Sequence, residues 1–176
     1  TYIVTEIGDY AFSGISSLQK DVIGDSITTI GVGAFRNCSK LKEVVIPAGV
    51  NYIGDKAFEK CDRLSLVVSR IEKPFDISED VFPQVSAKLN VPDGTKELYE
   101  KAKGWNVFST ILQGDMKEAE VDGMTYQYVT GDKVATLIKG ATKEKVLTIP
   151  TSVTIDGTPY EIKTINESAL ANISTI

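Results

Sequence analysis

Residues 30–47 read IGVGAFRNCSKLKEVVIP, and versions of this stretch occur before and after it. The motif Ile-Gly-x-x-Ala-Phe starts at Ile7, Ile30 and Ile53, which is a constant spacing of 23 residues. Self-similarity at such a period is typical of a solenoid, in which each copy forms one coil and buries its apolar face against its neighbours. The repeat therefore predicts an extended binding surface rather than a catalytic pocket.

The repeat continues past this motif in the same register. Position nine holds Ile15, Cys38 or Cys61, and position twelve holds Leu18, Leu41 or Leu64. A short apolar run follows, and Pro47 ends it in the middle copy, as expected of a strand, because proline has no amide donor. We predict parallel strands at residues 18–23, 41–46 and 64–69, with Phe12, Phe35 and Phe58 in one interior column. Two inward positions of these strands are polar, Asp21 and Ser69.

The composition excludes several classes of function. The 176-residue chain has no histidine, which removes Ser-His-Asp and Cys-His catalysis and most zinc chemistry. Its net charge is −5 and it has no basic run, so a nucleic-acid partner is disfavoured. No apolar stretch approaches the roughly 18 residues of a membrane-spanning helix. We expect a protein that is not an enzyme and that uses no cofactor and no metal.

Two cysteines, Cys38 and Cys61, lie one repeat apart in the slot that Ile15 fills in the first copy. An isoleucine in the same slot indicates that the slot is apolar and faces inward. We predict reduced thiols buried in adjacent coils. A disulfide between them is the alternative.

Residues 71–112 leave the repeat pattern, and we predict that they cap the array. The proposed elements are a strand at 88–92, a helix at 95–103 and a last short strand at 106–112. Leu98, Tyr99 and Ala102 would share one side of the helix, and Trp105, the sole tryptophan, would fold back onto the edge of the coils. A solenoid end exposes apolar interior, and such a segment would cover it.

The rest of the chain reads as a polar linker at 113–120 and a β-hairpin module at 121–176 that leads into a truncated second array. Hairpins are predicted from residues 124–129 with 133–138 and from 153–155 with 160–162, and a further strand at 146–149. Half a repeat ends the chain: Ile165, Ala169, Leu170, Ile173 and Ile176. Because that end and the first coil are both open, we expect weak head-to-tail self-association and either disorder or an intermolecular contact at 165–176.

A strip on the outer face of the strands is the candidate binding site. Strand alternation places six residues outward in two rows: Lys20, Glu43 and Leu66, and Val22, Val45 and Val68. The strip suits contact with a protein or a glycan. The alternative is a ladder of β-branched side chains that only stabilises the sheet.

Two weaker candidates have structural alternatives. Tyr126, Tyr128 and Tyr160 could stack on a sugar, but core positions in the hairpins are the favoured interpretation. The acidic run at 72–80, with Glu72, Asp76, Glu79 and Asp80, could hold calcium, but it lacks a loop pattern with a glycine pivot. We favour a solvated loop there.

The motif I-G-x-x-A-F-x-x-C-x-x-L with its V-x-I-P strand resembles the BspA-like leucine-rich repeat family, and residues 4–69 carry it. The resemblance implies a mainly β solenoid of right-handed leucine-rich-repeat coils with repeats at 7–29, 30–52 and 53–70. It also implies a secreted or surface-anchored bacterial protein that adheres to host matrix proteins or other cells. The alternative is a carbohydrate-binding or structural accessory domain of a secreted system that degrades or takes up glycans.

Overall fold

The computed structural model describes residues 2–83, 86–140, 149–166 and 169, with the backbone alone at residues 21 and 22. The chain divides into two compact units, Thr1–Gln113 and Gly114–Ile176. The first unit contains the repeats, and the second contains a single separate sheet.

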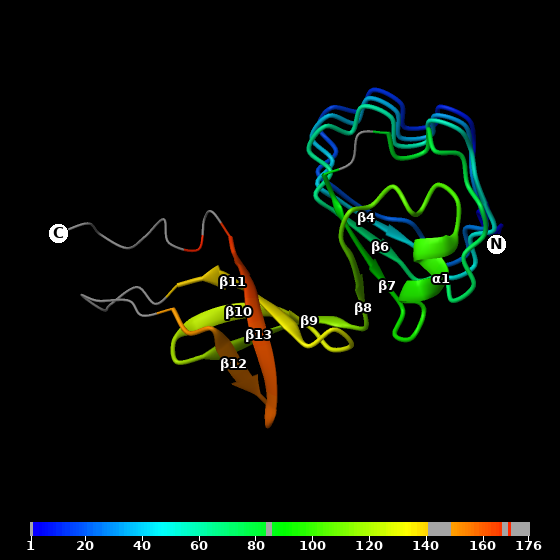
Figure 1. Cartoon of the computed structure of the whole chain (residues 1–176). Helices are drawn as coiled ribbons and strands as arrows, with labels where there is room; N and C mark the ends of the chain where they lie inside the picture. The colour runs from blue at the N-terminus through cyan, green and yellow to red at the C-terminus, as the bar shows by residue number, and fades with distance from the viewer. Residues whose placement is uncertain (1, 84–85, 141–148, 167–168, 170–176) are drawn as a thin grey trace. The chain divides into compact units, whose positions relative to one another are not determined.

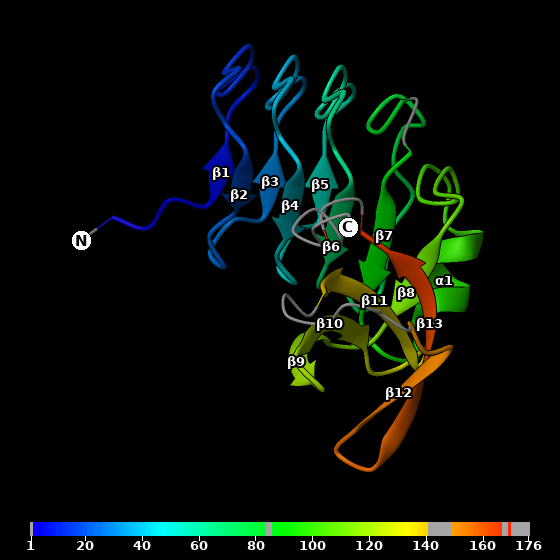
Figure 2. The ribbon, with the colours of Figure 1, turned by 90° about the vertical axis from the view of Figure 1, so that its left-hand side faces the viewer.

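Unit 1 is a stack of coils built on two parallel sheets (Figures 1 and 2). The larger sheet has five strands in order: β2 (Lys20–Val22), β4 (Glu43–Ile46), β6 (Leu66–Ser69), β7 (Lys88–Val91) and β8 (Ile111–Gln113). The smaller sheet has three: β1 (Glu6–Ile7), β3 (Thr29–Ile30) and β5 (Tyr52–Ile53). Figure 2 shows the coils side by side from the N-terminus onward. The predicted fold class, a mainly β repeat solenoid, is confirmed.

The strands are shorter than predicted because tight corners take up much of each coil. Position four of the repeat has a left-handed backbone in all three copies, with φ of 58° at Tyr10, 58° at Gly33 and 59° at Lys56. Position eight is also left-handed, with φ of 61° at Asn37 and 60° at Lys60. Tyrosine and lysine are not residues that signal such a corner in a sequence, since glycine normally takes it.

Aromatic rings form a column through the interior of the stack. Phe12, Phe35 and Phe58 are stacked with centroids 5.2 Å apart at both steps, which confirms the predicted column. Phe82 continues it 5.0 Å beyond Phe58. The coil that follows supplies Trp105, tilted at 5.9 Å from Phe82. One apolar cluster therefore runs through all the coils of unit 1.

The described residues between 71 and 92 (71–83 and 86–92) form a further coil of the stack and not the cap that was predicted from the sequence. Val67 of β6 pairs with Leu89 of β7 in parallel, and Leu89 pairs in turn with Ile111 of β8. The amide of Phe58 donates to the carbonyl of Val81 at 3.1 Å, the same bond that links the earlier coils. The array therefore continues through both strands that we had assigned to the capping segment.

The helix α1 (Lys96–Lys101) replaces the small-sheet strand in the last coil, and it is shorter than the predicted 95–103. Tyr99 and Ala102 are buried as predicted, but Leu98 is 48% exposed and does not share their side. Trp105 is fully buried, and its indole N–H donates to the carbonyl of Phe75 at 2.9 Å. Figure 2 shows α1 at the β8 end of the stack.

The buried Ser69 is explained by its contact with α1. Tyr99 donates its hydroxyl proton to the carbonyl of Ile71 at 2.7 Å, so the Ser69 hydroxyl donates to Tyr99 across 2.6 Å. The amide of Ile71 donates back to Ser69 Oγ at 3.3 Å. A buried polar group is tolerated when its hydrogen bonds are made. The serine at an otherwise apolar position therefore ties the third coil to the helix.

Unit 2 is a five-stranded sheet of two hairpins and an additional strand. Its order is β12 (Ser152–Ile155), β13 (Thr158–Ile165), β11 (Val134–Lys139), β10 (Met124–Val129) and β9 (Met116–Val121). Both predicted hairpins form, and β11 and β13 are joined in parallel. The predicted strand at 146–149 lies outside the described residues except for Ile149.

Residues 113–120 are not a linker over their whole length, because β9 occupies most of them. Lys117, Glu118 and Glu120 are exposed on this strand, which pairs with β10 on one side only. Charged residues are common on edge strands, where they discourage pairing with other chains. That polarity gave the stretch the appearance of a linker.

The three tyrosines of unit 2 belong to its core, as favoured from the sequence. Tyr126, Tyr128 and Tyr160 are all buried, and the rings of Tyr128 and Tyr160 meet edge to face with centroids 4.8 Å apart. They have little surface to offer to a sugar.

Candidate functional site

The predicted strip lies on adjacent strands of the large sheet in the expected register. Glu43 pairs with Lys20 on one side and Leu66 on the other, and Val45 pairs with Val22 and Val68. Between these rows, Val44 and Val67 are fully buried in the interior. Because strand residues alternate between faces, Glu43, Val45, Leu66 and Val68 share the outer face of β4 and β6, and Lys20 lies beside Glu43 on the same face.

The sheet extends both rows by one coil that the sequence reading did not include. Lys88 of β7 pairs with Leu66, and Asn90 pairs with Val68. The sequence did predict a strand at 88–92, but we assigned that strand to a cap and not to the repeat array. The outer strip is therefore defined here as Lys20, Val22, Glu43, Val45, Leu66, Val68, Lys88 and Asn90.

Exposure differs along the outer strip. Lys20 is exposed and forms an ion pair with Glu43 at 2.9 Å, while Leu66, Val68 and Lys88 are half-buried. Val45 is only 7% exposed, which fits a ladder of β-branched side chains at the centre of the valine row. The side chain of Val22 lies outside the described residues. The strip thus offers partly apolar groups beside a charged pair.

The sequence analysis did not identify an exposed tyrosine on the smaller sheet. Tyr52 of β5 is 50% exposed on the smaller sheet, where Thr29 of β3 is its partner in the neighbouring coil. The residue before position one faces outward in every copy, so the repeat pattern itself could have located it. Tyr52 lies away from the outer strip, on the other sheet of the same coils.

The repeated coils of unit 1 match a known family of repeat proteins. Residues 2–102 match the model of the BspA type leucine rich repeat region, described as six copies. The chain belongs to this family. The match covers more than half of the chain and extends beyond residues 4–69 into the coil of β7 and the helix α1. Comparisons with curated proteins and with solved structures gave no match.

Membership in the BspA-type family indicates a protein-interaction repeat module, of a kind that is generally non-catalytic and typically associated with bacterial surfaces. Within the described part of the chain, no helix combines the length and apolar character needed to cross a membrane.

The cysteine slot of the BspA-type repeat is interior. Cys38 and Cys61 are both reduced and buried, as predicted. The Cys38 thiol donates to the carbonyl of Phe12 at 3.2 Å, and the Cys61 thiol donates to the carbonyl of Phe35 at 3.3 Å. Each thiol thereby contacts the preceding coil. Burial raises the pKa of the Cys61 thiol to about 12, so the reactive thiolate is suppressed.

We expect alkaline pH to destabilise unit 1 through these buried groups. Burial also raises the pKa of Tyr99 to about 12. A group whose pKa is higher in the folded state than in the unfolded state stabilises the fold at every pH below its unfolded-state pKa. That stabilisation is lost as the pH rises toward the folded-state pKa. The free energy of unfolding should be level below pH 9, the ordinary value for Cys61, and should fall between pH 9 and about 12.

Urea unfolding at fixed pH values would measure this decline. In a Cys61→Ile variant, which places the residue of the first copy in the slot, the loss of stability between pH 9 and 10 should be smaller than in the parent, since Tyr99 has an ordinary value of 10. An identical loss over that range in the variant would contradict the assignment to the Cys61 thiol.

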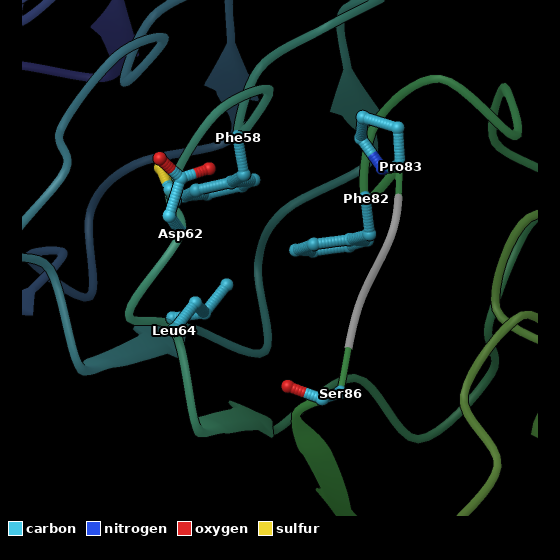
Figure 3. Close-up of a pocket in the computed structure, with 7 residues that line it drawn as sticks. Phe58, Asp62, Leu64, Phe82, Pro83 and Ser86 are labelled. Carbon is cyan, nitrogen blue, oxygen red and sulfur yellow. The ribbon is translucent and has the colours of Figure 1, made fainter.

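A small hollow lies beside the stacked rings of Phe58 and Phe82. Its volume of about 20 Å³ has room for one water molecule, and it is lined by Phe58, Cys61, Asp62, Leu64, Phe82, Pro83 and Ser86. Figure 3 shows the rings of Phe58 and Phe82 side by side above Leu64. Such a space is far too small for a ligand pocket.

The acidic run at 72–80 has a structural contact. Asp76 Oδ1 accepts a hydrogen bond from the backbone amide of Lys103 at 2.9 Å and so joins two coils. Among the residues that the structure describes, no group of three or more histidine, cysteine, aspartate or glutamate side chains could hold a metal ion.

Proposed function

We propose that unit 1 is an adhesion module whose outer strip binds a protein on a host surface or on another cell. The observation that carries this proposal is the register of β2, β4, β6 and β7, which gathers the strip on one continuous face. Parallel strands about 5 Å apart hold these side chains in fixed positions. The partner therefore meets a rigid surface and pays little ordering cost on that side.

The chemistry of the strip suits a protein ligand better than a glycan. Leu66 and Val68 offer apolar area next to the Lys20–Glu43 ion pair. Apolar contact framed by charge is the usual composition of a protein interface. Sugar binding generally uses exposed aromatic rings, and none of the residues of the outer strip is aromatic. The family's association with bacterial surfaces supports a secreted or cell-surface location and a host matrix protein as the ligand.

An array of immobilised matrix proteins and glycans would identify the ligand class, followed by affinity measurements on variants. Leu66→Gln with Val68→Thr removes apolar contact from the strip but keeps β-branching at position 68. We expect this double variant to weaken binding by about tenfold or more, as loss of central interface contacts does.

Tyr52→Gln is the matched control, because it removes an exposed side chain from the other sheet of the same coils. It should leave the affinity unchanged. The proposal is wrong if the double variant binds like the parent while Tyr52→Gln does not. A glycan that binds while every matrix protein fails would favour the carbohydrate-binding alternative.

A further inference from the structure

The turn that leads into the large sheet carries cationic side chains in successive coils. In the second and third coils this turn is closed by a hydrogen bond from the leucine amide of position twelve to the cysteine carbonyl of position nine, with lengths of 3.0 and 2.9 Å. Lys40 and Arg63 occupy the same place in these two turns, one residue before the leucine. The two side chains therefore belong to adjacent coils at one position of the repeat.

Two further lysines lie where the strands of the large sheet begin. The carbonyl of Lys42 accepts a hydrogen bond from the amide of Ser65 at 2.9 Å, and the carbonyl of Ser65 accepts one from the amide of Lys88, also at 2.9 Å. These bonds place Lys42 and Lys88 on either side of the third coil, and neighbouring strands lie about 5 Å apart. We define the basic edge as Lys40, Lys42, Arg63 and Lys88.

The cations of the basic edge are available to a ligand. Three of them are exposed and Lys88 is half-buried. In the part of the chain that the structure describes, none of the four takes part in a salt bridge. Glu43 is a neighbour of this edge, but it is already paired with Lys20. Asp62 is the one acidic residue at positions nine to twelve of the three repeats.

The basic edge is a product of the fold and not of the overall charge. The repeat distributes its four members between residues 40 and 88, so no basic run is visible in the sequence. The whole chain has a net charge of −5, and the acidic run at 72–80 directly surrounds position one of the fourth coil, away from this turn. A local excess of positive charge raises the concentration of anions at the surface.

The residues around the basic edge indicate which kind of anion it suits. Ser39 and Ser65, which flank its cations, are small and polar. A protein interface generally has an apolar centre, and single-stranded nucleic acid is generally held by aromatic rings. The basic edge has neither an apolar nor an aromatic residue among its members. A ligand that is linear, polar and strongly anionic fits it better.

We propose that the basic edge binds a linear acidic polysaccharide whose chain runs across the coils. Its sulfate or carboxylate groups would contact the four cations, which successive coils present at intervals of about 5 Å. Lysine and arginine form charge-assisted hydrogen bonds with such groups. This site is distinct from the protein-binding surface of the outer strip and shares only Lys88 with it.

Titration calorimetry of the whole 176-residue chain with heparin tests the proposal. A polyanion held by four cations releases bound counterions, so raising the salt from about 50 to about 200 mM should weaken binding about a hundredfold. The triple variant with Lys40→Gln, Lys42→Gln and Arg63→Gln keeps one cation of the edge. At about 50 mM salt it should bind about tenfold more weakly or worse, and its salt dependence over the same range should shrink to about threefold.

Lys73→Gln with Lys101→Gln and Lys103→Gln is the matched control, because it removes three exposed positive charges from other parts of unit 1. It should bind heparin like the parent. Asp62→Asn removes the acidic residue beside Arg63 and should strengthen binding, which a variant that merely damages the fold cannot do. A parent that does not bind heparin, or equal losses in the two triple variants, would overturn the proposal.

Two further measurements separate this site from a protein-binding one. The parent should bind heparin more tightly than poly-L-glutamate of similar length, and the reverse order would assign the edge to an acidic protein instead. Leu66→Gln with Val68→Thr should bind heparin like the parent, because both residues lie outside the basic edge. Loss of heparin binding in that variant, with binding retained in the triple variant of the edge, would refute the assignment.

Discussion

Gly54→Ala is expected to destabilise unit 1 by about 3 kcal/mol or more, at or above the upper end of the range for overpacking. The new Cβ would lie 2.4 Å from the backbone nitrogen of Val32, and backbone cannot move aside as a flexible side chain can. The Gly54 amide also donates to the carbonyl of Ile30 at 2.8 Å, so relieving the overlap means lengthening a bond that joins two coils. Urea unfolding followed by circular dichroism measures the loss.

Gly8→Ala controls for the intrinsic effect of alanine at the same repeat position. Measured on dilute, monomeric protein, it should change the free energy of unfolding by less than about 0.5 kcal/mol, as surface changes usually do. Equal losses at Gly8 and Gly54 would mean that the requirement for glycine is local and does not come from the neighbouring coil.

Trp105→Ala is expected to cost about 3–5 kcal/mol, as truncation of a large buried aromatic residue does. The indole is fully buried, it meets the ring of Tyr99 edge to face at 5.2 Å, and its N–H is bonded to the carbonyl of Phe75. The variant loses the last ring of the column and leaves that carbonyl without its donor. Unfolding by circular dichroism would report the change.

Leu98→Ala is the control for the helix end of unit 1. Its side chain is largely exposed and alanine favours helix, so its stability should stay within about 0.5 kcal/mol of the parent. The parent's tryptophan emission should be that of a shielded indole. Solvent-like emission, or a Trp105→Ala variant that melts with the parent, would contradict the closure of the stack by this residue.

The first three coils could be predicted because their interior residues keep one spacing. The fourth coil was missed because its motif, Ile77 to Phe82, has Ser78 in place of glycine and begins 24 residues after Ile53 rather than 23. The fifth was missed because a helix replaces its small-sheet strand and Trp105 replaces phenylalanine. In the fourth and fifth coils the aromatic residue still contacts the ring of the preceding coil, although the sequence motif is not conserved within the chain.

The environment of a side chain could be predicted where the repeat period determines it. It could not be predicted where contacts between coils determine it. Helical spacing placed Leu98 with Tyr99, but the partners of Tyr99 are Ser69 and Ile71, which no local pattern links to the helix. The outer strip followed from strand alternation. How far a neighbouring side chain covers Val45 depends on packing across strands, which a one-dimensional pattern does not contain.

Amide hydrogen exchange along the large sheet tests most directly the central claim that the coils continue unbroken through residues 71–112. The amide of Lys88 donates to the carbonyl of Ser65 at 2.9 Å, and the amide of Leu89 donates to the carbonyl of Thr110 at 3.0 Å. We predict that both exchange as slowly as the amides of β4 and β6, because one core supports all these strands. Rapid exchange of Lys88 and Leu89 while β4 and β6 stay protected would show that the stack ends at the third coil.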